Sequence, residues 1–100
     1  MLLQLMPPMV IADLGAGEGA FSQLLAQRAE RVIAVDNSAR MVEVGTRLAR
    51  ENGIGNLEYR QGDLEAPPIE EGSIDLAFFS QSLHHALHPE RAVEATARLL

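Results

Sequence analysis

The residues best suited to chemistry are the glycines of the segment Asp13-Leu14-Gly15-Ala16-Gly17-Glu18-Gly19. Glycine adopts positive φ without a side-chain penalty, so three glycines at alternate positions predict a sharp turn. Such a turn also leaves room for a ligand against the main chain. The first N–H groups of a following helix would add hydrogen-bond donors and a partial positive charge. This pattern is typical of a site for a nucleotide-like ligand.

Polar and acidic residues follow each of four apolar, strand-like segments. They are Asp13 through Gly19, Asp36-Asn37, Gly62-Asp63-Leu64 and Ser80-Gln81. In an open parallel sheet, ligands bind beyond the carboxyl ends of the strands, where these residues would meet. Asp36 could accept hydrogen bonds from two vicinal ribose hydroxyls, and it would repel a 2′-phosphate. Its alternative role is to cap the next helix, which Ser38 could do as well.

The glycine turn alone does not choose between nucleotides, since Gly15-x-Gly17-x-x-Ala20 also satisfies a dinucleotide-binding pattern. Asp13 separates a dinucleotide from a ligand without phosphate, because a carboxylate beside the turn repels a pyrophosphate and attracts an ammonium. A ligand with ribose hydroxyls, an amino-acid part and no phosphate is S-adenosylmethionine. The alternative for Asp13 is a buried acid bonded to the N–H groups of the turn itself, which is compatible with a ligand role.

The elements that must position these residues alternate between strand and helix. Hydrophobic patterning predicts strands over 9–14, 32–35, 57–61 and 74–79, the third half-exposed and near an edge and the others buried. Helices are expected over 18–28, 39–51 and from Pro89 onward. Their inward apolar residues would be Phe21, Leu24 and Leu25, then Met41, Val44 and Leu48, then Ala92, Val93, Thr96, Leu99 and Leu100. We therefore expect one α/β domain over 1–100, a Rossmann-like doubly wound parallel sheet of about four strands in the order 3-2-1-4.

Composition narrows the class of protein. The chain has 100 residues, 47% of them hydrophobic, and a net charge of −6. Its eight basic residues are all Arg and are scattered, so direct nucleic-acid contact is not expected. The absence of Cys removes disulfides and thiol chemistry and fits a cytoplasmic protein. The apolar opening is too short for a membrane span and lacks the basic flank of a signal peptide.

Four motifs in order resemble those of class I S-adenosylmethionine-dependent methyltransferases. The segment Asp13 to Gly19 looks like their D-x-G-x-G-x-G motif. Val35-Asp36 resembles the acidic end of their second strand, and Gly62-Asp63-Leu64 resembles the turn after their third strand. The segment from Ser82 to Leu100 is similar to the region after the fourth strand in the ubiquinone-methyltransferase-like branch. The segments Leu14-Gly15-Ala16-Gly17-Glu18-Gly19 and Ser80-Gln81-Ser82-Leu83-His84-His85 also resemble methyltransferase domains of ArsR-type regulators, although no winged helix is present.

The resemblance, which covers about 9–100, implies methyl transfer to a small-molecule acceptor and a set of cofactor-binding residues. The resemblance implies that the methionine part is held by Asp13, Gly15, Ala16 and Gly17 and that the ribose is held by Asp36. It implies that the pocket is lined by Asn37 and Met41 and that the adenine is framed by Gly62, Asp63 and Leu64. The sulfonium would be faced by Ser80 and Gln81. Two alternatives stay open: an NAD-binding oxidoreductase domain, and a non-catalytic fragment or interaction module.

The resemblance also has a limit, because the family sheet has seven strands and this chain ends after the fourth and its helix. We therefore expect a truncated, cofactor-binding part whose open sheet flank could form a homodimer. His84 and His85 are weak candidates for a substrate-side general base, and capping or packing roles are the alternative. His84 and His88, four residues apart, could share a metal, but no metal site is predicted.

Overall fold

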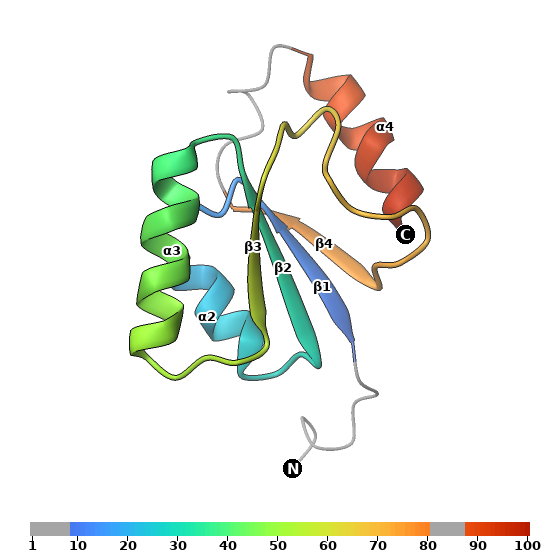
Figure 1. Cartoon of the computed structure of the whole chain (residues 1–100). Helices are drawn as coiled ribbons and strands as arrows, with labels where there is room; N and C mark the ends of the chain where they lie inside the picture. The colour runs from blue at the N-terminus through green and yellow to red at the C-terminus, as the bar shows by residue number, and fades with distance from the viewer. Residues whose placement is uncertain (1–8, 81–87) are drawn as a thin grey trace.

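The computed structural model describes residues 9–80 and 88–100. Its elements are β1 (Val10–Leu14), α2 (Ala20–Ala26), β2 (Arg31–Asp36), α3 (Ala39–Glu51), β3 (Leu57–Gln61), β4 (Leu76–Phe79) and α4 (Pro89–Leu99). Within the described residues, four strands form one sheet in the order β3-β2-β1-β4, and every neighbouring pair is parallel (Figure 1). The predicted fold class and strand order are confirmed. Gln81, His84 and His85 lie outside the described residues.

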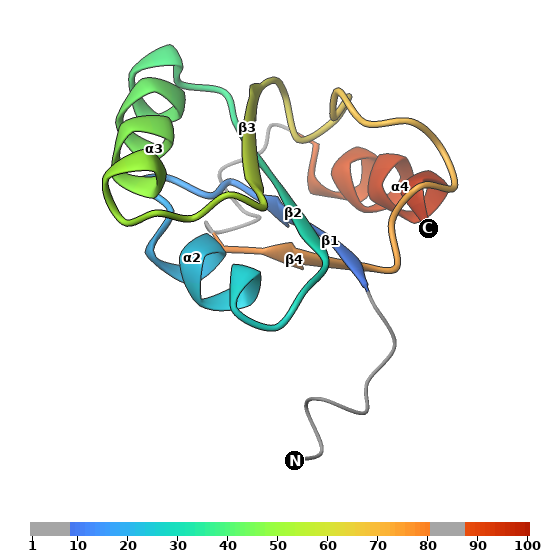
Figure 2. The same cartoon turned by 60° about the horizontal axis from the view of Figure 1, so that its bottom comes forward.

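The sheet is covered on both faces: α2 and α3 lie on one side and α4 on the other (Figure 2). Alternate residues of the central strands supply the two cores. Ile11 and Val32 pack with Ala26 on the α2 side, whereas Leu14 and Val35 belong to the cluster that includes Leu99 of α4. Burial on both faces explains why β1 and β2 are nearly continuous apolar runs.

Strand β4 is shorter and more exposed than predicted. It begins at Leu76, which is 38% exposed, and its other residues are half-buried. The cause is its position, since β4 bonds to β1 alone among the described strands. Asp75 lies just before the strand and pairs with Val10 in both directions: its N–H donates to the Val10 carbonyl at 2.8 Å, and its Oδ2 accepts the Val10 N–H at 2.8 Å.

The inward faces of two helices were predicted correctly only in part: Leu25 of α2 packs against the core as predicted, but Phe21 and Leu24 do not. In α2 the buried residues are Ser22 and Ala26, while Phe21 and Leu24 are 40% and 54% exposed. The helix begins only after Gly19, whose left-handed φ of 93° sets its phase and turns small side chains toward the sheet. Phe21 instead packs edge-on against Phe78 of β4, with ring centroids 5.3 Å apart. In α4 the prediction is confirmed for Ala92, Thr96 and Leu99, which are buried together with Ala95, and it is wrong for Val93 and Leu100, which are exposed.

Backbone hydrogen bonds draw the segments after the strands to one edge of the sheet. The N–H groups of Gly15 and Ala16 donate to the Val35 carbonyl at 2.7 and 3.0 Å. The Gly62 N–H donates to the Asp36 carbonyl, and the Ser80 N–H to the Leu14 carbonyl, each at 3.0 Å. The predicted site residues that follow all four strands therefore converge. No helix within 9–80 or 88–100 is long and apolar enough to cross a membrane.

Candidate cofactor site at the carboxyl ends of the strands

The glycine turn between β1 and α2 has the conformation that its sequence predicts. Gly15, Gly17 and Gly19 have φ values of 73°, 59° and 93°, in the left-handed region that other residues rarely adopt. All three are buried, with Ala16 between them, and Glu18 is exposed. The turn therefore presents main chain rather than bulky side chains at the edge of the sheet.

Asp36, at the end of β2, is the carboxylate that braces this turn. It is 7% exposed. Its Oδ2 accepts the Gly17 N–H at 2.9 Å, and its Oδ1 accepts the Ser38 N–H at 2.9 Å. Helix α3 is capped by Ser38, whose Oγ accepts the Met41 N–H at 3.3 Å, so Asp36 is not its cap. A carboxylate has about four lone-pair sites, so two are left for further donors.

Asp13, at the end of β1, is fully buried and faces α2. Its Oδ2 accepts a hydrogen bond from the Ser22 hydroxyl and its Oδ1 one from the Ser80 hydroxyl. The partners are thus serine hydroxyls and not the N–H groups of the turn. Burial raises the pKa of Asp13, and the hydrogen bonds from Ser22 and Ser80 act in the opposite direction. Through them Asp13 links β1, α2 and the end of β4.

The remaining predicted residues occupy the same edge with less burial. Asp63 is exposed, and its Oδ1 accepts the Glu65 N–H at 2.9 Å. Leu64 is half-buried and packs against the α4-side core. Asn37 is exposed, and its carbonyl accepts from the Gln61 side chain at 3.4 Å. Met41 is half-buried in the first turn of α3, beside the Asp36–Ser38 bend.

Tyr59 of β3 is a residue that the sequence analysis missed. It pairs with Ala34 in the sheet, and its hydroxyl donates to the Gly17 carbonyl at 3.2 Å. Burial, followed by the nearby charges of Asp13, Asp36 and Glu18, raises the pKa of Tyr59 to about 12, against a lowering hydrogen bond with Ser22. One signal in the sequence could have pointed to it: Tyr59 is the only tyrosine of the chain, and it lies between the charged residues Glu58 and Arg60 of the predicted strand.

The charges around the turn discriminate between ligands. Three carboxylates lie at this edge of the sheet, since Asp13 and Asp36 lie at the ends of the neighbouring strands β1 and β2 and Glu18 lies in the turn that Asp36 contacts. Such an edge disfavours the two negative charges of a pyrophosphate and favours a cationic group. Asp36 adds acceptor capacity of the kind that a vicinal diol requires. The residues therefore fit S-adenosylmethionine, which carries an ammonium, a sulfonium and a ribose.

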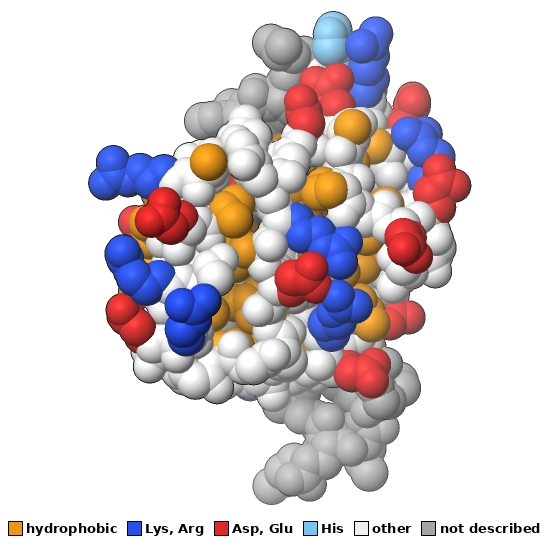
Figure 3. Space-filling view, viewed as in Figure 1, with side chains coloured by type: hydrophobic (Ala, Val, Ile, Leu, Met, Phe, Trp, Pro, Cys, Tyr) orange, Lys and Arg blue, Asp and Glu red, His pale blue; other side chains and the backbone are white. Residues whose placement is uncertain are grey.

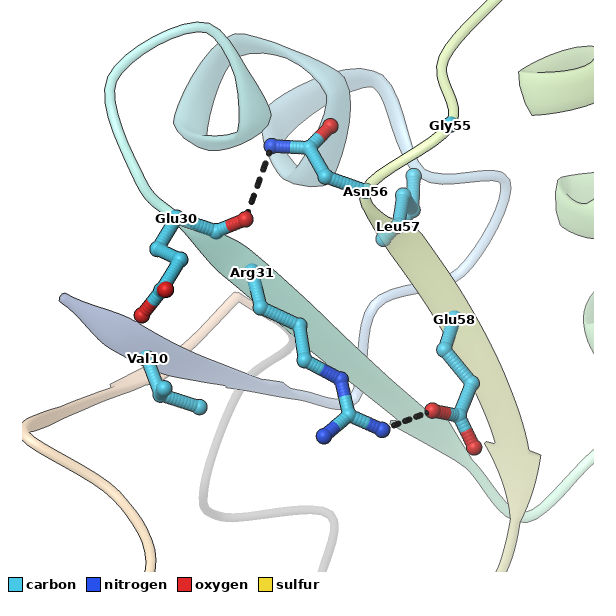
Figure 4. A pocket seen from close by; sticks show the side chains of 7 residues that line it. All are labelled: Val10, Glu30, Arg31, Gly55, Asn56, Leu57 and Glu58. Carbon is cyan, nitrogen blue, oxygen red and sulfur yellow. Dashed lines mark hydrogen bonds and ion pairs between the residues drawn. The ribbon is translucent and has the colours of Figure 1, made fainter. Parts of the chain in front are cut away.

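A hollow on the surface lies at the opposite ends of the strands. It is lined by Val10, Glu30, Arg31, Gly55, Asn56, Leu57 and Glu58 (Figure 4). Arg31 and Glu58 form an ion pair across it. The Asn56 amide donates to the Ala26 and Ala29 carbonyls at 2.8 and 3.0 Å, which satisfies the end of α2. The Arg31, Glu58 and Asn56 side chains of this hollow thus have partners within the protein, and the hollow is remote from the glycine turn.

The histidine that the structure describes takes part in local contacts. The His88 N–H donates to Glu65 Oε2 at 3.3 Å, and its Nδ1 lies 3.6 Å from Glu90 Oε1. Among residues 9–80 and 88–100, no group of three or more His, Cys, Asp or Glu residues could hold a metal ion.

A parallel sheet of this order, with a glycine turn after its first strand and an acid after its second, defines a Rossmann-like domain for a nucleotide cofactor. Residues 12–100 match the family model described as "Methyltransferase domain". The chain therefore belongs to this methyltransferase family.

Several relatives extend this assignment. The chain is 32% identical over 90 residues to the uncharacterized methyltransferase YcgJ of Bacillus subtilis, covering 90% of this chain and 36% of that protein. It is 33% identical over 98 residues to the ubiquinone/menaquinone biosynthesis C-methyltransferase UbiE of Hydrogenovibrio crunogenus, covering 94% and 39%. The chain thus spans well under half the length of these relatives.

Solved structures agree with the sequence relatives. The crystal structure of YcgJ superposes with a TM-score of 0.90 at 28% identity, covering 99% of this chain and 44% of that one. A putative S-adenosyl-L-methionine-dependent methyltransferase of Methanococcus maripaludis gives 0.88 at 26% identity, covering 95% and 44%. S-adenosylmethionine is the cofactor that this family and these neighbours imply, which favours the methyltransferase over the NAD-binding alternative.

Proposed function

We propose that this chain is the cofactor-binding part of an S-adenosylmethionine-dependent methyltransferase that acts on a small-molecule acceptor. The observation that carries the proposal is the contact between Asp36 and the glycine turn. When bound, S-adenosylmethionine would supply a methyl group on a positively charged sulfur: a nucleophile attacks the methyl carbon in line, and the sulfur leaves with the electron pair of the broken bond. The described residues supply binding, orientation and charge, which are the main sources of rate in such a transfer.

Asp36 is proposed to hold the ribose. Two backbone N–H groups, from Gly17 and Ser38, fix the orientation of its carboxylate before any ligand arrives. Its remaining lone pairs are then available to two vicinal hydroxyls. This arrangement needs no rearrangement of the side chain on binding, so little conformational entropy is lost there.

The glycine turn and Asp13 are proposed to hold the methionine part. Gly15 and Gly17 bring backbone close to the ligand, and Asp13 provides negative charge beneath them. Because Asp13 is fully buried, it acts on an ammonium through its electric field and through the exposed Ser80, whose hydroxyl donates to it, and not by direct contact. Ser80, at the end of β4, then stands on the sulfonium side, where Gln81 is also proposed to lie.

The loop after β3 is proposed to frame the adenine. Asp63 uses one oxygen, Oδ1, for the Glu65 N–H, and its other oxygen could accept from the exocyclic amine of the base. Leu64 supplies an apolar surface beside it, anchored on the core below. Asn37 and Met41 would close the pocket from the α3 side.

The class of acceptor is argued from the relatives. One is named as a ubiquinone/menaquinone biosynthesis C-methyltransferase and another as a ubiquinone biosynthesis O-methyltransferase. On the face seen in Figure 3, Arg side chains are interspersed with acidic ones, which fits a small-molecule acceptor better than nucleic acid. A cytoplasmic location stays a prediction, and so does a homodimer through the edge of β4 that pairs with no other described strand.

Calorimetry with S-adenosylhomocysteine tests the proposal, with NADH as the comparison ligand. We expect a dissociation constant in the micromolar range, about −8 kcal/mol, and no heat with NADH. A folded sample that gives no heat with millimolar S-adenosylhomocysteine contradicts the proposal. Binding of NADH in its place favours the oxidoreductase alternative.

A further inference from the structure

Tyr59 is built into the underside of the glycine turn, although it lies on β3, two strands away from β1. Its hydroxyl donates to the Gly17 carbonyl at 3.2 Å. The N–H of the same residue, Gly17, donates to Asp36 Oδ2 at 2.9 Å. Both hydrogen-bonding groups of Gly17 are therefore held, one by β3 and the other by β2.

Two glycines make room for the tyrosine ring. A Cβ placed on Gly19 would lie 2.1 Å from Tyr59 Oη, and one placed on Gly45 of α3 would lie 2.2 Å from Tyr59 Cζ. Real Cβ atoms do not approach that closely, so the ring fills the space that these residues leave. The third glycine of the turn, Gly19, therefore leaves the space that the tyrosine ring fills. The ring is held between the start of α2 and the middle of α3.

The Tyr59 hydroxyl would keep its donor proton at physiological pH even with its ordinary pKa of 10.0, and burial and the surrounding carboxylates raise that pKa to about 12. Gly17 is held between one donor, the Tyr59 hydroxyl, and one acceptor, the Asp36 carboxylate, and the sheet fixes the positions of both. A glycine-rich turn has many accessible conformations, so such contacts select the one in which Asp36 and the turn face a common ligand.

We propose that Tyr59 is a positioning residue for the cofactor: its hydroxyl holds the Gly17 carbonyl and so keeps the glycine turn in register with Asp36. This rests on the proposed function, because the turn and Asp36 are there assigned to the methionine part and the ribose. Tyr59 acts through Gly17 and makes no contact with the cofactor itself.

The Tyr59→Phe variant of the 100-residue chain tests this, since phenylalanine retains the ring and removes only the hydroxyl. We expect binding of S-adenosylhomocysteine to weaken about two- to tenfold, the range that corresponds to one neutral hydrogen bond. Without ligand, NMR should show the Gly17 amide exchanging its hydrogen faster by a similar factor. The Val35 amide, fully buried in β2, exchanges through global unfolding, so its rate gives the overall loss of stability against which the Gly17 change is compared.

Ser73→Ala is the matched control, because it removes a hydroxyl that donates to the Glu70 carbonyl at 2.6 Å on an exposed turn. It should change neither measurement. An unchanged Gly17 exchange rate in Tyr59→Phe overturns the proposal, and so does faster exchange with full affinity for S-adenosylhomocysteine. If the unmodified chain binds no S-adenosylhomocysteine, the proposed function fails, and the exchange rates still decide whether Tyr59 holds the turn.

Discussion

Replacement of Asp36 by asparagine is the substitution that most sharply separates cofactor binding from folding. The carboxylate now accepts the Gly17 and Ser38 N–H groups, one on each oxygen. Asparagine retains one acceptor oxygen and places an NH2 group against the other donor. One charge-assisted hydrogen bond to the ribose is lost, worth about 1.5–3 kcal/mol. Affinity for S-adenosylhomocysteine should therefore fall about 10- to 150-fold.

The same substitution leaves one backbone N–H without its partner, at a cost of about 1–3 kcal/mol in the free energy of unfolding. Urea unfolding measures that cost, and calorimetry on the folded variant measures the affinity. Asp75→Asn is the matched control, since Asp75 also accepts a backbone N–H, that of Val10 at 2.8 Å, at the opposite end of the strands. It should retain affinity, because asparagine can still accept the Val10 N–H and the site lies away from the glycine turn. A folded Asp36→Asn chain with full affinity refutes the ribose assignment, and an equal loss in Asp75→Asn refutes its specificity.

Two further substitutions test how the turn is built. Gly19→Ala should lower the free energy of unfolding by more than Gly53→Ala in urea titrations: both positions have positive φ, 93° and 69°, but only at Gly19 would the new Cβ meet Tyr59. Equal losses would show that the ring does not occupy that space. Asp13→Asn should gain stability relative to the unmodified chain as the pH rises above 3.8, the ordinary pKa of the group. Burial raises the pKa of Asp13, so the folded chain binds the carboxyl proton more tightly than the unfolded chain does. The stability of the unmodified chain therefore falls as the pH rises from 3.8 to the raised pKa, and the asparagine variant lacks this loss. A stability difference that is constant with pH would contradict the effect.

The architecture could be predicted because it follows from local patterns. Buried parallel strands are continuous apolar runs, and their alternation with helices leaves few topologies. The glycine turn needs positive φ at Gly15, Gly17 and Gly19, and only their residue type allows it without strain. Asp36 and Ser38 could be placed because a strand end and a helix start are both local signals.

Features that depend on neighbours distant in sequence could not be predicted. The apolar spacing of Phe21 and Leu24 indicated an inward face for α2, but the structure buries Ser22 instead, where its hydroxyl donates to Asp13 of β1. Tyr59 looked like an ordinary strand residue, since nothing in its own segment shows that two glycines, 40 and 14 positions earlier, make room for its ring.

The central claim is that the carboxyl edge of the sheet binds S-adenosylmethionine through Asp36 and the glycine turn. A crystal structure of the chain with S-adenosylhomocysteine tests it most directly. We predict both ribose hydroxyls within hydrogen-bond distance of the Asp36 carboxylate and the amino-acid part against Gly15 and Gly17. A ligand bound at the amino ends of the strands, or one whose ribose does not contact Asp36, would contradict the claim.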